Sequence, residues 1–108
     1  MSEAGNNVFG GRLKEARLRA ELSQKSLGIA AGLDASVAST RINRYELGVH
    51  KVDYPFACRL AAELSVPTAY FFTDDDALAT LILLYGQASK RARARMLAAA
   101  REISSPGT

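Results

Sequence analysis

The chain has 108 residues and a formal net charge of +3, a size that fits one domain with a modest core. Its mild positive charge permits a nucleic-acid partner without requiring one. The single cysteine and single histidine exclude an internal disulfide and a zinc site made of such residues. The first residues lack the basic start and apolar run of a signal peptide, and no apolar stretch could span a bilayer. We therefore expect a protein of the reducing cytoplasm.

Positive charge is concentrated in the first half of the chain. Residues 1–52 hold eight Lys or Arg against five acids, whereas residues 53–108 hold six against six. The first expected helix alone carries four basic residues, namely Arg12, Lys14, Arg17 and Arg19. A nucleic-acid surface is therefore expected in the first half.

The composition favours an all-α fold, because Ala, Leu and Arg dominate and no alternating strand pattern is found. Residues 1–8 are expected to be a disordered tail. The expected elements then follow in chain order: a helix over 10–20, a second from 24 to Gly32 capped by Ser23, a third capped by Asp34 or Ser36 and ending at Gly48, a fourth after Asp53, and a short fifth over 66–72.

The remaining residues predict an apolar C-terminal region. Three consecutive aspartates, 74–76, complement the dipole of a sixth helix with the sequence ALATLILLY. On that helix Leu78, Leu81, Ile82 and Tyr85 share one face and are expected to meet the core, whereas Leu83 and Leu84 point elsewhere. Gly86 and Ser89 favour a break before a seventh helix that ends near Ile103, although one continuous helix is the alternative. Residues 104–108 are expected to be a disordered tail.

The segment LDASVASTRINRYELG, residues 33–48, is unusually polar for a helix of this chain. On a wheel at about 100° per residue, its inner face holds Ala35, Ala38, Ile42 and Tyr45. The outer side offers short hydrogen-bonding groups, one arginine and small apolar groups, from Ser36, Val37, Ser39, Thr40, Asn43, Arg44 and Leu47. Asn can bind adenine, Arg guanine and Val a thymine methyl group in the major groove. Taken alone, such a face is more often that of an ordinary exposed helix.

The surrounding sequence favours the DNA-reading alternative, because a helix, a glycine-containing turn and a second helix form the layout of a helix-turn-helix motif. Over residues 9–72 the sequence resembles the phage repressor-like (Cro and Xre) helix-turn-helix proteins. The matching stretches are FGGRLKEARLRAELSQ, LGIAAGL, INRYELG and PFACRLAAELSVPTAYFF. The resemblance implies a lambda-repressor-like five-helix domain over residues 9–73, followed here by one or two additional helices within 74–103.

The function implied by the resemblance is sequence-specific binding of double-stranded DNA by a transcriptional regulator, with repression the favoured role. The third helix is then expected to read bases through Ser36, Val37, Ser39, Thr40, Asn43 and Arg44. Phosphates are expected to meet Ser23, Gln24, Lys25, Arg41, His50 and Lys51, of which Ser23 and Lys25 lie at a helix N-terminus that favours anions. The resemblance also implies a structural ion pair between Arg17 and Glu46.

One departure from the family pattern lies between Gly32 and Ile42, where DASVAS adds about four residues. Either the turn of the motif is longer, or the third helix gains a turn at its N-terminus. A recognition helix reads bases with its N-terminal part, and the additional residues lie at that end. The family's base-reading role is therefore assigned more firmly to Asn43 and Arg44 than to Ser36, Val37 or Ser39.

The C-terminal helices are expected to form a symmetric homodimer. One recognition helix covers few base pairs, and two-fold pairing matches a palindromic operator with half-sites about one helical turn apart. The expected interface residues are apolar, namely Leu78, Leu81, Leu83, Leu84, Met96 and Leu97. The basic run KRARAR, residues 90–95, is interpreted as a solvated face or as a source of inter-subunit ion pairs.

Two other function classes, a protein-interaction module and an enzyme, make different demands on the sequence. An antitoxin-like or other protein-interaction module could use the same C-terminal helices to bind a partner protein. An enzyme is not expected, because the sequence holds no paired carboxylates, nucleophile–base set or phosphate-binding loop. No cofactor, metal or membrane partner is expected, and the compartment is the cytoplasm, in association with the nucleoid.

Overall fold

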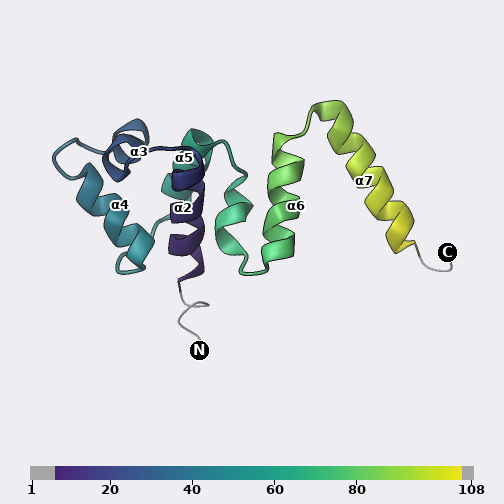
Figure 1. The fold of residues 1–108 in the computed structure, drawn as a ribbon, viewed down its shortest axis with the longest axis horizontal. Helices are drawn as coiled ribbons and strands as arrows, with labels where there is room; N and C mark the ends of the chain where they lie inside the picture. The colour runs from purple at the N-terminus through teal and green to yellow at the C-terminus, as the bar shows by residue number, and fades with distance from the viewer. Residues whose placement is uncertain (1–6, 106–108) are drawn as a thin grey trace.

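The computed structural model describes residues 7–105, and all regular structure in that range is helical, as the sequence predicts. Residues 1–6 and 106–108, with most of both expected tails, lie outside the described range. The elements are arranged as shown in Figure 1 and have the following bounds: α2 Val8–Arg19, α3 Gln24–Ala30, α4 Ala38–Leu47, α5 Tyr54–Leu64, the 3-10 helix η1 Thr68–Phe72, α6 Asp76–Gln87 and α7 Lys90–Ser104.

Four helices begin at a side chain that accepts a hydrogen bond from their first turn, which explains where they start. Ser23 accepts from the Ser26 amide, Asp53 from Phe56, Asp75 from Leu78 and Ser89 from Ala92. Gly48 ends α4 with a φ of 78°, a left-handed conformation that suits glycine. The break between α6 and α7 is therefore present, and Ser89 caps the second of the two helices.

The tail and first-helix boundaries differ from those expected. Helix α2 begins at Val8 rather than at residue 10, and α7 includes Ser104. At the N-terminal boundary the Asn7 side chain donates a hydrogen bond of 3.1 Å to the Glu46 carbonyl, which ties the start of α2 to the end of α4. Val8 and Ser104, each expected to lie in a tail, are therefore helical.

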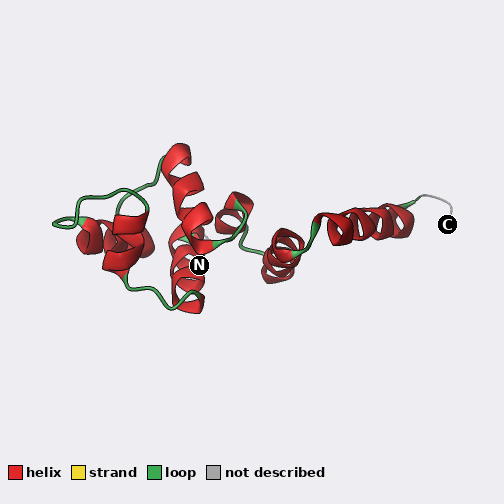
Figure 2. Ribbon diagram, turned by 90° about the horizontal axis from the view of Figure 1, so that it is seen from above, coloured by secondary structure: helices red, strands yellow, loops and turns green. Residues whose placement is uncertain are grey.

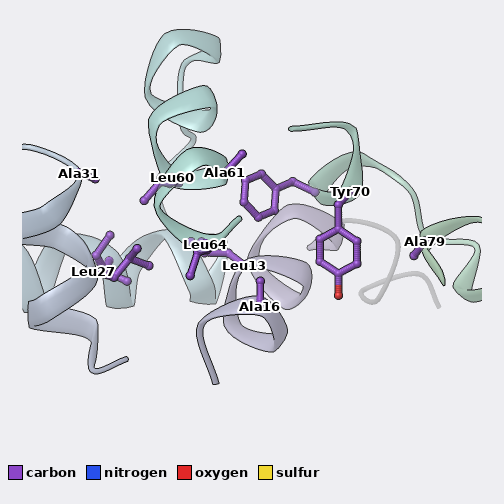
Figure 3. Packing of buried hydrophobic residues seen from close by; sticks show 11 residues of the cluster. Leu13, Ala16, Leu27, Ala31, Leu60, Ala61, Leu64, Tyr70 and Ala79 are labelled. Atoms are coloured by element: carbon purple, nitrogen blue, oxygen red, sulfur yellow. The ribbon is translucent and has the colours of Figure 1, made fainter. Parts of the chain in front are cut away.

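One hydrophobic core joins α2 to α6, and part of it is shown in Figure 3. Each of the six elements contributes at least one buried apolar side chain, as follows: Leu13 and Ala16 from α2, Leu27 from α3, Ile42 from α4, Leu60, Ala61 and Leu64 from α5, Tyr70 and Phe71 from η1, and Ala79 from α6. Because α6 shares this core, it belongs structurally with the preceding helices.

Arg12, expected to be part of a basic surface, is instead buried between α2 and the start of α6. Its Nε donates to the Thr73 carbonyl at 2.9 Å, and its guanidinium also contacts Glu15 at 3.2 Å and Asp76 at 3.0 Å. Burial is the largest single influence on the pKa of Arg12, and it lowers this pKa. The hydrogen bonds to Asp76 and Glu15, together with the nearby negative charge, outweigh burial, so the pKa of Arg12 is raised overall. Arg12 therefore connects two helices and is not free to meet DNA.

Helix α6 turns a different face to the core from the one expected. Ala79 is buried, and Ile82 and Leu83 pack on the core, whereas Leu78 and Leu81 are exposed. The reason lies at Gly86, where a Cβ atom would come within 2.5 Å of the Pro67 ring. The close contact that only glycine permits here orients the helix so that Leu83, and not Leu81, points inward.

Helix α7 makes the molecule elongated. It projects away from the other helices in two perpendicular views (Figures 1 and 2), and none of its residues is buried. The described chain extends 57 × 35 × 22 Å with a radius of gyration of 15.9 Å, compared with about 13 Å for a compact domain of this length. The chain thus consists of a compact α2–α6 body and a separate α7.

Candidate nucleic-acid interface

Helices α3 and α4 are held against each other by a close backbone contact. A Cβ atom on Gly28 would lie 2.7 Å from the Ala38 Cβ and 3.0 Å from the Ala38 carbonyl oxygen. Leu27 and Ile42, both 0 % exposed, fill the space beside this contact. The two helices therefore form a rigid helix-turn-helix unit.

The additional residues lie in the turn, since α4 begins only at Ala38. Asp34 Oδ1 accepts hydrogen bonds from the Ser36 amide at 2.8 Å and from the Ser36 hydroxyl at 2.7 Å. These two bonds, the hydroxyl first, lower the pKa of Asp34. The expectation that Asp34 or Ser36 caps the helix was wrong, because they close a turn ahead of it and the N-cap is Val37. Ala35, expected on the inner face, is exposed in the same turn.

The expected base-reading residues are all exposed, although they come from two elements. Ser39, Thr40, Asn43 and Arg44 lie on α4, whereas Ser36 and Val37 precede it. A shallow hollow of about 180 Å³ joins the two groups and is lined by Ser36, Val37, Thr40, Arg41 and Arg44. The turn therefore stays beside the exposed face of α4, and this combined surface, residues 36, 37, 39, 40, 43 and 44, is called the reading face below.

Behind the reading face, Arg17 of α2 and Glu46 of α4 form a buried ion pair. Arg17 Nε lies 2.5 Å from Glu46 Oε2, and Nη2 lies 3.2 Å from Oε1. The third guanidinium nitrogen donates to the Leu22 carbonyl at 2.9 Å. Since the two residues are only 8 % and 6 % exposed, Arg17 has no access to DNA.

Gln24 connects this ion pair to the reading face. Its Nε2 donates to Glu46 Oε1 at 3.0 Å and to Asn43 Oδ1 at 3.1 Å. An ionised carboxylate can only accept hydrogen bonds, so Gln24 must present its NH₂ group to Glu46, and its second hydrogen then requires an acceptor from Asn43. The buried pair thus fixes which end of the Asn43 amide is turned toward α3. The phosphate contact expected of Gln24 would have to come from its backbone N–H, because both side-chain hydrogens are in use.

The other expected phosphate residues lie before and after α4. Ser23 caps α3 and Lys25 is exposed in its first turn. His50 and Lys51 are exposed in the loop after α4, beside a hollow of about 260 Å³ that Phe9, Tyr45 and Phe72 also line. Arg41 is half-buried at the edge of the reading face.

Sequence reasoning missed Asn7, which holds the end of α4 through its hydrogen bond to the Glu46 carbonyl. The residue lies in a small, polar N-terminal stretch without apolar periodicity, so no local pattern distinguished it from a tail. No helix within 7–105 is both long and apolar enough to cross a membrane. The same residues include no group of three His, Cys, Asp or Glu side chains arranged to hold a metal ion.

These features define a helix-turn-helix fold with two additional C-terminal helices. Comparison with known protein families gave no matching family profile, and comparison with curated proteins gave no match either. Among solved structures, the transcriptional regulator BswR is similar with a TM-score of 0.81 and 38 % sequence identity, over 86 % of this chain and 92 % of that chain. The chain therefore belongs to the family of transcriptional regulators to which BswR belongs.

Proposed function

We propose that the protein is a sequence-specific regulator of transcription that binds double-stranded DNA and reads the major groove with α4. One observation carries this proposal: a polar, exposed reading face sits on a helix-turn-helix unit that is braced from behind by the buried Arg17–Glu46 pair. Braced groups lose little freedom on binding, which favours selective contacts. The similarity to the transcriptional regulator BswR supports the same function.

In the proposed complex, base contacts and phosphate contacts come from different parts of the unit. Asn43 and Arg44 would meet base edges, with Ser36, Val37, Ser39 and Thr40 beside them. Lys25 and Lys51, with Ser23, Arg41, His50 and the Gln24 backbone, would hold phosphates and set the register. The protein would act by occupying DNA, with repression the favoured outcome, rather than by catalysis.

We further propose that the working form is a homodimer on a palindromic operator, joined through residues 74–103. The exposed apolar side chains of α6 and α7, which a lone protomer leaves in contact with water, support this assembly. We assign this regulator to the Xre group of helix-turn-helix proteins and expect it in the cytoplasm, bound to the nucleoid. The proposed DNA-binding unit ends after Gln87 rather than at residue 73, because α6 packs on the same core.

Selection of bound fragments from a random double-stranded DNA pool tests this function. We expect enrichment of one sequence with two inverted half-sites about one helical turn apart. A pool that stays random through successive rounds, while the protein remains folded, would contradict sequence-specific DNA binding.

The alternative of a protein-interaction module, such as an antitoxin-like protein, draws on the same exposed α6 and α7 side chains. Sedimentation alone and after mixing with cell extract separates the two. Self-association of the pure chain favours the regulator. A chain that stays monomeric until one foreign protein joins it favours the module.

A further inference from the structure

Helix α7 lacks the packing that normally maintains a helix. None of its 15 residues is buried, and an isolated helix of about this length is marginal in water. We call Lys90–Ser104 the arm. Such a segment needs a surface to pack on, and the helix has an apolar stripe suited to one.

Arg93 fixes the direction in which the arm leaves the body. Its Nε donates to the Tyr85 carbonyl at 2.9 Å and its Nη2 to the Gly86 carbonyl at 2.7 Å. The guanidinium also lies 5.2 Å from the centre of the Tyr85 ring. Arg93 thus satisfies the last carbonyls of α6 and clamps the junction at which the chain turns through the extended residues Ala88 and Ser89. In this arrangement the arm projects away from its own protomer (Figure 1).

The arm carries an apolar stripe in which two small and two large residues alternate. Ala92, Met96, Ala99 and Ile103 follow one another at spacings of four, three and four residues, the pattern of a helix that packs lengthwise on another helix. Ile103 is 83 % exposed in the protomer. Ala99 is also exposed, and Ala92 and Met96 are half-buried, so the stripe has apolar surface left for a partner.

The outer face of α6 is the matching surface. It presents four large apolar side chains that are between 43 % and 57 % exposed, namely Leu78, Leu81, Leu84 and Tyr85. We call these four residues the α6 outer face. They lie on the side of α6 opposite Ala79, Leu83 and Gly86, which face the body.

We propose that two copies of the chain exchange their arms, so that the stripe of each arm covers the α6 outer face of the other protomer. This inference deepens the proposed homodimer and rests on it. Reciprocal exchange is closed and two-fold symmetric, which leaves neither apolar surface in water.

Charge favours this pairing over contact between two arms. Two arms side by side would bring together four exposed cations each, Lys90, Arg91, Arg95 and Arg101, against a single acid, Glu102. By contrast, exposed aspartates at 74 and 75 directly precede α6, and the helix has no basic residue. The second copy thus supplies both the apolar and the charged complement.

Disulfide trapping tests the exchange directly. In a Cys58→Ser background, a Leu81→Cys chain is mixed with a Met96→Cys chain, and a second mixture uses Ala99→Cys to allow for a shift in register. We expect an 81–96 or 81–99 cross-link between two chains under mild oxidation. The Ala94→Cys chain, which carries its exposed thiol on the opposite side of the arm, should not cross-link to residue 81.

A 96–96 cross-link without either mixed product would overturn arm exchange and indicate arm-to-arm pairing. The absence of any cross-link from a chain that sediments as a dimer would overturn it as well. Operator binding is measured on the same samples, so that loss of the exchange is distinguished from failure of the DNA-binding function. A chain that binds the operator but is a monomer would contradict the dimer while leaving the reading face intact.

Discussion

Arg17 and Glu46 lie 29 residues apart in the sequence and form a buried, two-point ion pair that joins α2 to the last turn of α4. The same Glu46 carboxylate accepts the Gln24 side chain, which in turn holds Asn43. Gln24 therefore links the buried ion pair to the reading face by hydrogen bonds to both. Stability of the fold and orientation of a proposed base-reading residue consequently depend on the same group.

Replacement of Arg17 by Met should lower the free energy of unfolding by about 3–5 kcal/mol, because Glu46 would keep its charge without its partner. The Arg17→Met/Glu46→Leu double variant should recover much of the loss, since no unpaired charge remains. Urea unfolding measures both, with Lys14→Met on the exposed side of α2 as the control. A loss below about 1 kcal/mol for Arg17→Met, the scale of a surface pair, would contradict a buried interaction.

Gly28→Ala should destabilise the protein by about 1–3 kcal/mol, because its added Cβ would collide with the Ala38 Cβ and push α3 away from α4. Gly11→Ala is the matched control, since a Cβ there meets no atom within 4 Å. The control should stabilise α2 by about 0.5–1 kcal/mol through helix propensity alone. Thermal unfolding of the two variants should therefore shift in opposite directions, and equal shifts would refute the close contact.

Lys25→Ala and Lys51→Ala should each reduce the slope of log binding constant against log salt by roughly one unit, as expected for the loss of one phosphate contact. Lys90→Ala, at the start of the distant arm, provides a control whose slope should not change. Binding to a fixed duplex is measured across a range of salt concentrations. If neither Lys25 nor Lys51 changes the slope, DNA must contact another surface.

Gln24→Met should relax base selection at the position that Asn43 reads, because the released Asn43 amide can then rotate. Overall affinity should fall less than selectivity, since a phosphate contact through the backbone N–H of residue 24 survives the change. Competition among duplexes that differ at single base pairs gives the result. Relaxation spread evenly over the whole operator would argue against a specific link between Gln24 and Asn43.

The sequence predicted the order and type of the helices because their apolar periodicity and caps are local signals. Ser23, Asp53, Ser89 and Gly48 each act within one helical turn, and each begins or ends a helix as expected. The turn before α4 was not decided by such signals, because Asp34 can cap a helix or close a turn equally well. The helix begins at Ala38, the residue that packs against Gly28 of α3, a contact that no local signal indicates.

The contacts missed by sequence reasoning are those made between distant elements. In the sequence, Arg12 is one of four basic residues on the first helix. Nothing near it in the sequence indicates that it donates hydrogen bonds to Thr73 and Asp76. The orientation of α6 likewise depends on the close approach of Gly86 to Pro67, which apolar periodicity cannot resolve on a helix that is apolar on most sides. The placement of Leu83 inward and Leu81 outward follows from that approach.

Base reading by α4 is tested most directly by the ratio of specific to non-specific DNA affinity in the Asn43→Ala variant. The selected operator and a scrambled duplex of equal length are titrated at one salt concentration. We expect Asn43→Ala to weaken operator binding by about 1–3 kcal/mol and to leave scrambled-duplex binding nearly unchanged, so that the ratio falls by roughly 5- to 150-fold. A ratio equal to that of the unaltered protein would show that Asn43 does not read the DNA and would contradict the account.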